Sequence, residues 1–142
     1  MNRRDLLAST GIIGAAGAMG IASSAMAGGH SHQHKSSHGV CEALANCIEK
    51  AEICSSHCIE MISEHPGLKD CLKATVDCSK ICGVLLSIVN SGSPLVSSMA
   101  AVCIEACENC IAACSSHAAM HSACQECLEA CEACIAACKE LS

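Results

Sequence analysis

Regularly spaced cysteine is the feature that most constrains how this chain can fold. Sixteen of the 142 residues are cysteine, whereas phenylalanine, tyrosine and tryptophan are absent. Aromatic side chains supply much of an ordinary hydrophobic core and of most protein interfaces, so the core here must be built differently. A cysteine content this high is typical of a chemically specialised chain. The length suits a single domain.

Four stretches with a helical period predict the secondary structure. They are residues 40–63, 68–89, 93–116 and 122–141. In the third stretch, Ser93 is the expected N-cap and Pro94 the first helical residue. Asn90-Ser91-Gly92 is expected to end the second. The connections are short and no strand pattern occurs, so the predicted fold class is all-α, an antiparallel four-helix bundle over residues 40–142.

On a helical wheel, the cysteines of each stretch fall on one stripe. Those of the fourth stretch lie within an arc of about 80°, and those of the third within about 60°. Only Cys41 lies off its stripe, by about 120°. We call the other fifteen the seam cysteines: Cys47, Cys54, Cys58, Cys71, Cys78, Cys82, Cys103, Cys107, Cys110, Cys114, Cys124, Cys127, Cys131, Cys134 and Cys138. They take the positions where a bundle normally has leucine, which predicts a cysteine-lined interior.

Three interpretations of the seam compete. Cysteine can act as a small hydrophobic residue, but a core of cysteine alone buries little area at each position. The chain can be a disulfide scaffold, although neighbours three or four residues apart on one helix bridge poorly. Bridges between helices remain open. The third interpretation is metal binding by thiolates.

Spacing and charge favour a soft monovalent ion. Side chains at i and i+4 on a helix have Cβ atoms about 5–6 Å apart, so two such thiolates can hold one two-coordinate ion. Six pairs have this spacing: Cys54/Cys58, Cys78/Cys82, Cys103/Cys107, Cys110/Cys114, Cys127/Cys131 and Cys134/Cys138. Fifteen buried thiolates would carry a charge of about −15, which monovalent ions shared between sulfurs would nearly neutralise. Cu(I) is therefore favoured and zinc is second, because zinc needs a tetrahedral set of four ligands. Iron–sulfur clusters usually use a loop-borne spacing that does not occur here.

One end of the predicted bundle collects imidazole and thioether groups. They are His57, Met61, His65, His117, Met120 and His121. These groups bind Cu(I) without the charge of a thiolate and more weakly, so they suit a mouth through which ions enter and leave. The alternative is that the methionines fill gaps and the histidines are merely solvated. The opposite end has Met99 and the candidate ligand Cys41, and is otherwise apolar.

The N-terminal residues have the pattern of an export signal. Arg3-Arg4 precedes an apolar segment, and Ala25-Met26-Ala27 forms a small-x-small cleavage site. The paired arginines suggest the twin-arginine route, which moves folded proteins. A transmembrane anchor is the weaker alternative, because the segment is barely long enough and poorly hydrophobic. We therefore expect residues 1–27 to be removed and the mature chain to lie in the periplasm or another extracytoplasmic space, free of the membrane.

Residues 28–39 form a polar, histidine-rich segment that we expect to be a flexible arm. Cleavage after Ala27 would leave Gly28-Gly29-His30 as the new N-terminus. A free amine, two amides and the His30 imidazole make a square-planar nitrogen set, which suits Cu(II) or Ni(II). The arm is thus a candidate site for oxidised copper.

The cysteine-striped helices resemble the bacterial copper storage proteins, in particular their exported members. The strongest motif is Cys103-x-x-x-Cys107-x-x-Cys110-x-x-x-Cys114, echoed from Cys124 to Cys138. The resemblance implies a four-helix bundle that assembles as a homotetramer and lines up Cu(I) ions on inward-facing cysteines. The methionine and histidine mouth also resembles that of the family.

The predicted function is storage or buffering of many Cu(I) ions, without catalysis. No nucleophile–base pair with an orienting third group is evident. Nucleic-acid binding is disfavoured because the formal net charge is −6 and arginine occurs only at Arg3 and Arg4. Two alternatives stay open: a thiol–disulfide redox protein of the cell envelope, and a zinc-binding buffer that resembles metallothionein.

Overall fold

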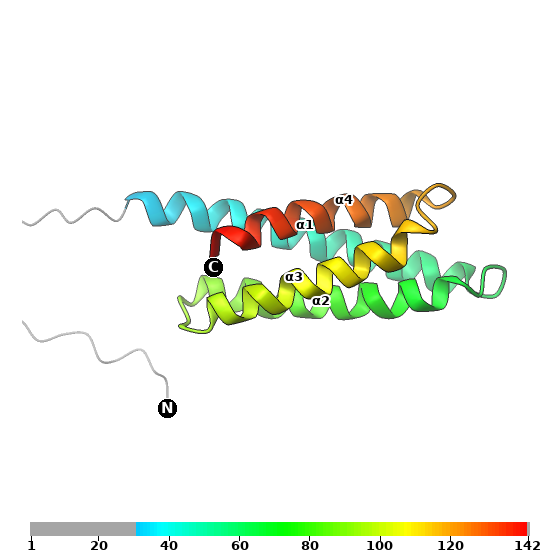
Figure 1. Cartoon of the computed structure of the whole chain (residues 1–142), viewed down its shortest axis with the longest axis horizontal. Coiled ribbons are helices and arrows are strands. Elements are labelled where there is room, and N and C mark those ends of the chain that lie inside the picture. Colours follow the sequence, from blue (N-terminus) through cyan, green and yellow to red (C-terminus); the bar gives the residue numbers. More distant parts are fainter. Residues whose placement is uncertain (1–30, 142) are drawn as a thin grey trace, which may run out of the picture.

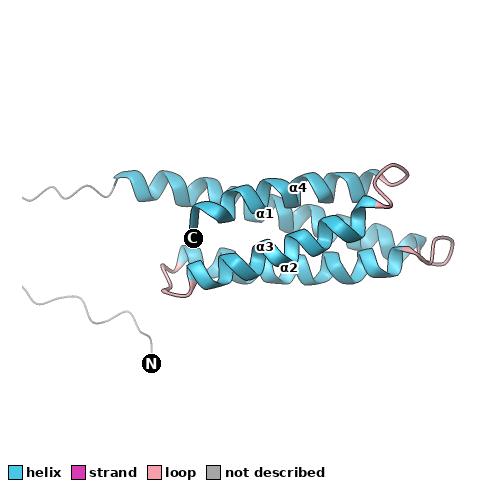
Figure 2. Cartoon of the chain, in the orientation of Figure 1, coloured by secondary structure: helices cyan, strands magenta, loops and turns pink. Residues whose placement is uncertain are grey.

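The computed structural model describes residues 31–141, with side chains from residue 37 onward. These residues form four antiparallel helices (Figure 1). They are α1 (Ser31–Met61), α2 (Leu68–Asn90), α3 (Val96–Ser115) and α4 (Ser122–Cys138), and the short 3-10 helix η1 (Lys139–Leu141) follows α4. Residues 31–141 contain only helices and loops (Figure 2). The predicted all-α bundle is confirmed.

The helices surround a central axis. α1 contacts α2 and α4, and α3 contacts the same two helices. The α1–α2 and α3–α4 connections lie together at one end of the bundle, which we call the loop end (Figure 1). The α2–α3 connection and the end of α4 lie at the other, which we call the far end. Each helix therefore presents one stripe of side chains to the space between the four.

The end of α2 shows why the chain turns where the sequence predicted. Gly92 has a φ of 64°, a left-handed conformation that favours glycine. Its amide donates to the Val89 carbonyl (3.1 Å), and the Ser93 amide donates to the Ile88 carbonyl (3.0 Å). This pair of bonds is a Schellman motif, which satisfies two carbonyls at the helix end. The predicted stop at residues 90–92 is confirmed.

Two helix starts differ from the sequence prediction. α1 begins at Ser31, so residues 31–39, expected as a flexible arm, continue the helix. No proline interrupts this segment, so hydrogen bonding extends outward from the docked part of α1. α3 begins at Val96 instead of Pro94. The Ser93 hydroxyl accepts a bond from the Leu95 amide (3.2 Å), which makes a turn before the helix starts.

The core consists mainly of thiols, with aliphatic residues at both ends. All fifteen seam cysteines have no exposed surface, and Cys41 is half-buried, as the helical wheel predicted. Val40, Leu44 and Leu85 are buried toward the far end, and Leu68 is buried at the loop end. The far end is thus closed by aliphatic side chains.

We expect Leu44→Ala to destabilise the copper-free protein by about 2–5 kcal/mol, because Leu44 is fully buried and among the largest core side chains. Urea unfolding followed by circular dichroism measures this change. Ile59→Ala is the control, since Ile59 is 62% exposed on the same helix. Equal stability losses in the two variants would show that the aliphatic closure does not hold the copper-free bundle together.

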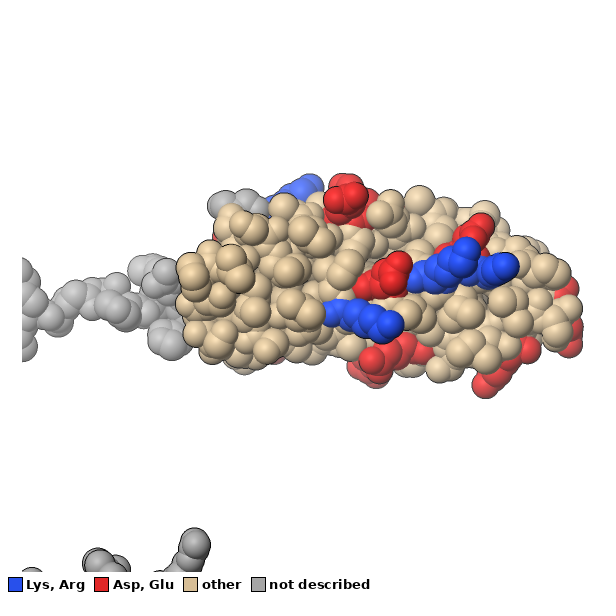
Figure 3. All heavy atoms as spheres, turned by 90° about the horizontal axis from the view of Figure 1, so that it is seen from below, with Lys and Arg blue, Asp and Glu red and all other residues tan. Residues whose placement is uncertain are grey.

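The outer surface carries charges of both signs. Figure 3 shows one face, on which acidic and basic side chains are interspersed among uncharged ones. Lys50 of α1 pairs with Glu126 of α4 at 2.7 Å, which links two adjacent helices. α3 is long and apolar enough by composition to cross a membrane, with a mean hydropathy of 1.3, but here it packs against α2 and α4 within the bundle.

Candidate metal centre

The seam cysteines meet across helices along the whole bundle axis. Near the middle, the sulfurs of Cys47, Cys78 and Cys131 form a triangle with all three sides 3.8 Å. These residues come from α1, α2 and α4. Three ligands around a metal at a bond length of about 2.3 Å would have sulfurs about 4 Å apart. The triangle can therefore hold a three-coordinate soft ion with little movement.

Similar contacts continue on both sides of the triangle. Toward the loop end, the Cys54 sulfur lies 3.8 Å from Cys71 and 3.7 Å from Cys124. Toward the far end, Cys82 lies 3.4 Å from Cys103 and 4.0 Å from Cys134. Five groups of sulfurs lie within 4.8 Å of one another: Cys47/Cys78/Cys82/Cys107, Cys54/Cys58/Cys71/Cys124, Cys82/Cys103/Cys107/Cys134, Cys54/Cys114/Cys127 and Cys78/Cys110/Cys131. The thiols form a continuous tube.

Contacts between helices add to the pairs that the sequence predicted. Three of the six predicted i,i+4 pairs have sulfurs in close contact: Cys78/Cys82 at 3.9 Å, Cys110/Cys114 at 4.0 Å and Cys134/Cys138 at 3.9 Å. Every group of three or four sulfurs, however, draws on two or more helices. Sequence spacing could not show this, because it gives positions on one helix and not the alignment of neighbouring helices.

All sixteen cysteines lie in the described part of the chain, and each is a free thiol. The shortest sulfur–sulfur distance in the tube, 3.1 Å, joins Cys71 of α2 to Cys114 of α3. Even this pair is not bonded. The structure therefore has the geometry of a ligand array and not that of a disulfide scaffold.

Burial and hydrogen bonding shift the pKa values of the thiols in opposite directions. Burial raises the pKa of Cys124 to about 11 and also raises the pKa of Cys58. A hydrogen bond from Cys107 is the main cause that lowers the pKa of Cys103 to about 5. A neighbouring S–H group thus favours the thiolate form of Cys103, whereas burial favours the thiol form of Cys124. An incoming cation must displace the remaining protons, so metal binding is coupled to proton release.

Thr75 takes a seam position that the cysteine spacing left unexplained. It is fully buried between Cys71 and Cys78 on α2. Its hydroxyl lies 3.0 Å from the Cys71 carbonyl and 2.8 Å from the Ser55 hydroxyl of α1. The sequence signal that could have identified Thr75 is the seven-residue interval between Cys71 and Cys78, in which Thr75 takes the i+4 position on the same helix face. Because the hydroxyl has hydrogen-bond partners, Thr75 can replace a thiol in the core without an unsatisfied polar group.

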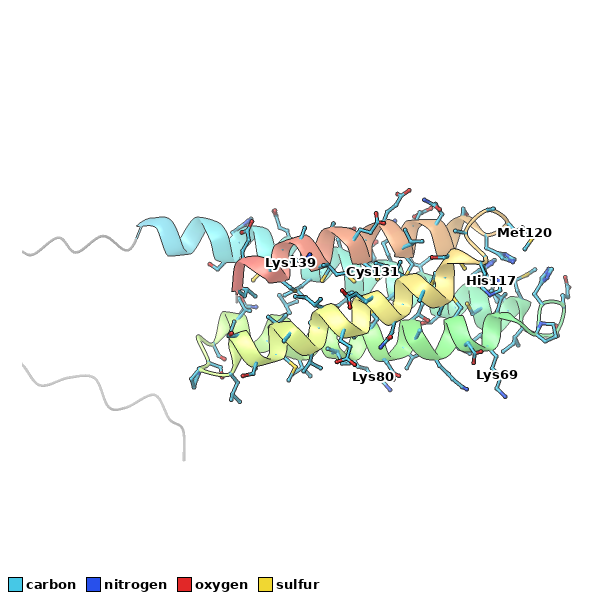
Figure 4. The ribbon with its side chains drawn as sticks, in the orientation of Figure 1. Lys69, Lys80, His117, Met120, Cys131 and Lys139 are labelled. Atoms are coloured by element: carbon cyan, nitrogen blue, oxygen red, sulfur yellow. The ribbon has the colours of Figure 1, made fainter. Side chains whose placement is uncertain are left out.

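Imidazoles gather at the loop end, as the sequence predicted. The Nε2 atom of His57 lies 2.9 Å from Nδ1 of His121, and the ring of His65 is 5.2 Å from that of His121. His117 and Met120 belong to the α3–α4 loop at this end (Figure 4). His121 is buried, whereas Met120 is 70% exposed and Met61 is half-buried. The structure brings the histidines together more closely than the methionines.

The remaining candidate residues lie elsewhere. The Cys41 sulfur donates to the side-chain oxygen of Asn90 at 3.6 Å near the far end, outside the five sulfur groups. His30, the candidate Cu(II) ligand, lies outside the described residues, as does the predicted leader over residues 1–27. The Cu(II) site therefore stays a prediction.

Comparison with known proteins identifies the family. The sequence profile for copper storage proteins matches residues 32–142. The chain belongs to the copper storage protein family. A Bacillus subtilis relative named as the uncharacterized cysteine-rich protein YhjQ is 29% identical over 84 residues, which are 59% of this chain and 75% of that protein.

Solved structures of family members share the fold. The Cu(I)-bound copper storage protein BsCsp3 superposes with a TM-score of 0.69 and 28% identity, over 75% of this chain and 97% of that one. The copper-free form of copper storage protein 3 from Bacillus subtilis gives a TM-score of 0.66 at 28% identity, over 74% and 97%. A cytosolic copper storage protein from Streptomyces lividans gives 0.71 at 24% identity, over 77% and 93%.

These neighbours correct the predicted location. An extracytoplasmic chain was expected, but the structural relatives include a cytosolic copper storage protein and copper storage protein 3, which point to the cytosol. The prediction relied on the composition of residues 1–27, which lie outside the described residues.

Proposed function

We propose that this chain stores Cu(I) by binding many ions along the tube of seam cysteines. The observation that carries the proposal is the unbroken series of buried sulfurs from four helices, in contact across the bundle axis. Soft thiolates select Cu(I), and a Cu(I)-bound family member shares the fold. The family points to storage and not to catalysis.

Charge explains why the cargo is monovalent. A fully deprotonated tube would carry about −15 in a site without water, which no fold of this size can bear. One Cu(I) for each thiolate cancels that charge, and ions shared between neighbouring sulfurs satisfy two- or three-coordinate geometry. Zinc would use four thiolates for two positive charges and leave the tube strongly negative.

Copper passes through the loop end in this proposal. His57, His117 and His121 lie together there and can bind Cu(I) weakly without adding negative charge. The far end is closed by Val40, Leu44 and Leu85, which offer no ligand. Ions therefore load from one side, and a reducing cytosol keeps the thiols available. The homotetramer that the resemblance implies remains a prediction.

Anaerobic titration with Cu(I) against a strong chelator tests the function. We expect a plateau near one ion for each seam cysteine, about fifteen, with release of about one proton for each ion bound. Thiolate-to-copper absorption in the near ultraviolet can be read directly, because the chain has no tryptophan or tyrosine. A plateau of about four ions or fewer would instead indicate tetrahedral zinc-type sites. Disulfides in freshly isolated protein would favour the redox alternative.

A further inference from the structure

Four histidines from three segments converge at the loop end. His57 lies on α1, His65 in the α1–α2 loop, His117 in the α3–α4 loop and His121 directly before α4. We call them the histidine cluster. The ring of His121 is at the centre, with centroid distances of 4.9 Å to His57, 5.2 Å to His65 and 6.4 Å to His117. Segments far apart in the sequence thus place their imidazoles around the ring of His121.

The central imidazole has a free ligand atom. His121 is 7% exposed, and its Nε2 atom is buried without a hydrogen-bond partner. An unsatisfied buried nitrogen is destabilising unless something occupies it. A buried ring nitrogen without a hydrogen-bond partner suits a metal ligand.

The composition of the cluster favours a divalent ion over Cu(I). Imidazoles are borderline ligands that suit Zn²⁺. Cu(I) has far better ligands in the thiolates below. Carboxylates also attract positive charge to this side, since Glu49, Glu52 and Glu60 line a shallow groove with His57. The loop end of the bundle thus has a site of nitrogen donors next to the tube of sulfur donors.

We propose that the histidine cluster binds one Zn²⁺ in the copper-loaded protein and thereby closes the tube. A filled tube has no free thiolates to draw zinc inward, so the imidazoles become its best ligands. The bound ion would occupy the end through which copper passes in the proposed function, and its charge would repel Cu(I) leaving the tube. This inference rests on the proposed storage function, because it regulates release of the stored copper.

Zinc binding and copper release test the inference separately. Equilibrium dialysis of copper-loaded protein against Zn²⁺ should give one bound zinc, with shifts of imidazole proton resonances in the NMR spectrum. The rate of copper transfer to a chelator that binds Cu(I) but not Zn²⁺ should then fall several-fold. In the double variant His65→Ala/His117→Ala, zinc affinity should fall by more than about 100-fold, beyond the effect of losing a supporting hydrogen bond alone.

Matched controls keep the outcomes distinct. His38→Ala removes a histidine whose side chain is 75% exposed near the other end of α1, and it should leave zinc binding unchanged. His121→Ala is avoided because that ring is buried and its loss can disturb folding. If copper-loaded protein binds no zinc, or zinc leaves copper release unchanged, the inference is overturned. If the protein takes up no copper, the storage function fails, and NMR titration of the copper-free protein with Zn²⁺ still shows whether the imidazoles bind it.

Discussion

Filling the tube with Cu(I) is expected to raise the melting temperature of the protein by at least about 15 °C. Ligand in large excess over its dissociation constant stabilises a fold by about 4 kcal/mol for each site, and about 1 kcal/mol shifts the melting temperature of a domain this size by about 4 °C. Many sites act together here. Copper would also cancel the repulsion between thiolates and join helices through shared ligands, as α1, α2 and α4 at Cys47, Cys78 and Cys131.

Thermal unfolding followed by circular dichroism measures this shift under anaerobic conditions. Removing the copper with a strong chelator should return the melting temperature to its starting value, which separates metal binding from irreversible change. The Cys41→Ser variant serves as the control, because that thiol lies outside the sulfur groups and its loss should leave the shift intact. Identical melting temperatures with and without copper would mean that the ions do not bridge helices.

Replacing the central triangle, Cys47→Ala/Cys78→Ala/Cys131→Ala, is expected to divide the tube. The copper plateau should fall by about three ions if each thiolate is matched by one Cu(I). Ions moving from the loop end to the far end would also lack the three closely spaced sulfurs, 3.8 Å apart, that serve as ligands at the middle of the tube. Uptake should therefore become biphasic, with a fast phase at the loop end and a slow phase beyond the triangle.

Chelator-monitored uptake and the final copper count test this variant together. Its melting temperature without copper must be measured as well, because three alanines leave small cavities in the core. The matched control is Cys41→Ala, which removes a thiol and leaves the tube complete. An unchanged plateau with single-phase uptake would show that the triangle holds no copper and is no part of the path.

Much of this arrangement could be predicted from particular residues. Cysteines spaced by three and four residues must share one helix face, so the burial of all fifteen and the exclusion of Cys41 followed directly. Gly92 marked the end of α2 in the same way, because the chain needs a left-handed residue there. The histidines at the loop end followed from counting helix ends in an antiparallel bundle.

Other features were beyond prediction because they depend on how neighbouring helices align. The closest sulfur pair, Cys71 and Cys114, joins residues 43 positions apart, and no spacing rule connects them. Thr75 was not identified from the sequence, and its bond to Ser55 depends on the register of α1 against α2. The turns of α1 before Val40 contain no apolar residues with a helical period, so the sequence pattern did not predict them as helix. The leader-like composition of residues 1–27 led to the wrong compartment.

The sequence by itself determined that four helices would turn their thiols toward a common axis, because helical periodicity is a local property of the backbone. The tertiary structure decided which thiols lie in contact across helices, and it placed a buried, unsatisfied imidazole at the loop end. Those outcomes depend on distances of a few ångströms between separate helices and loops. Such distances come from the packing of whole elements, which no local pattern contains.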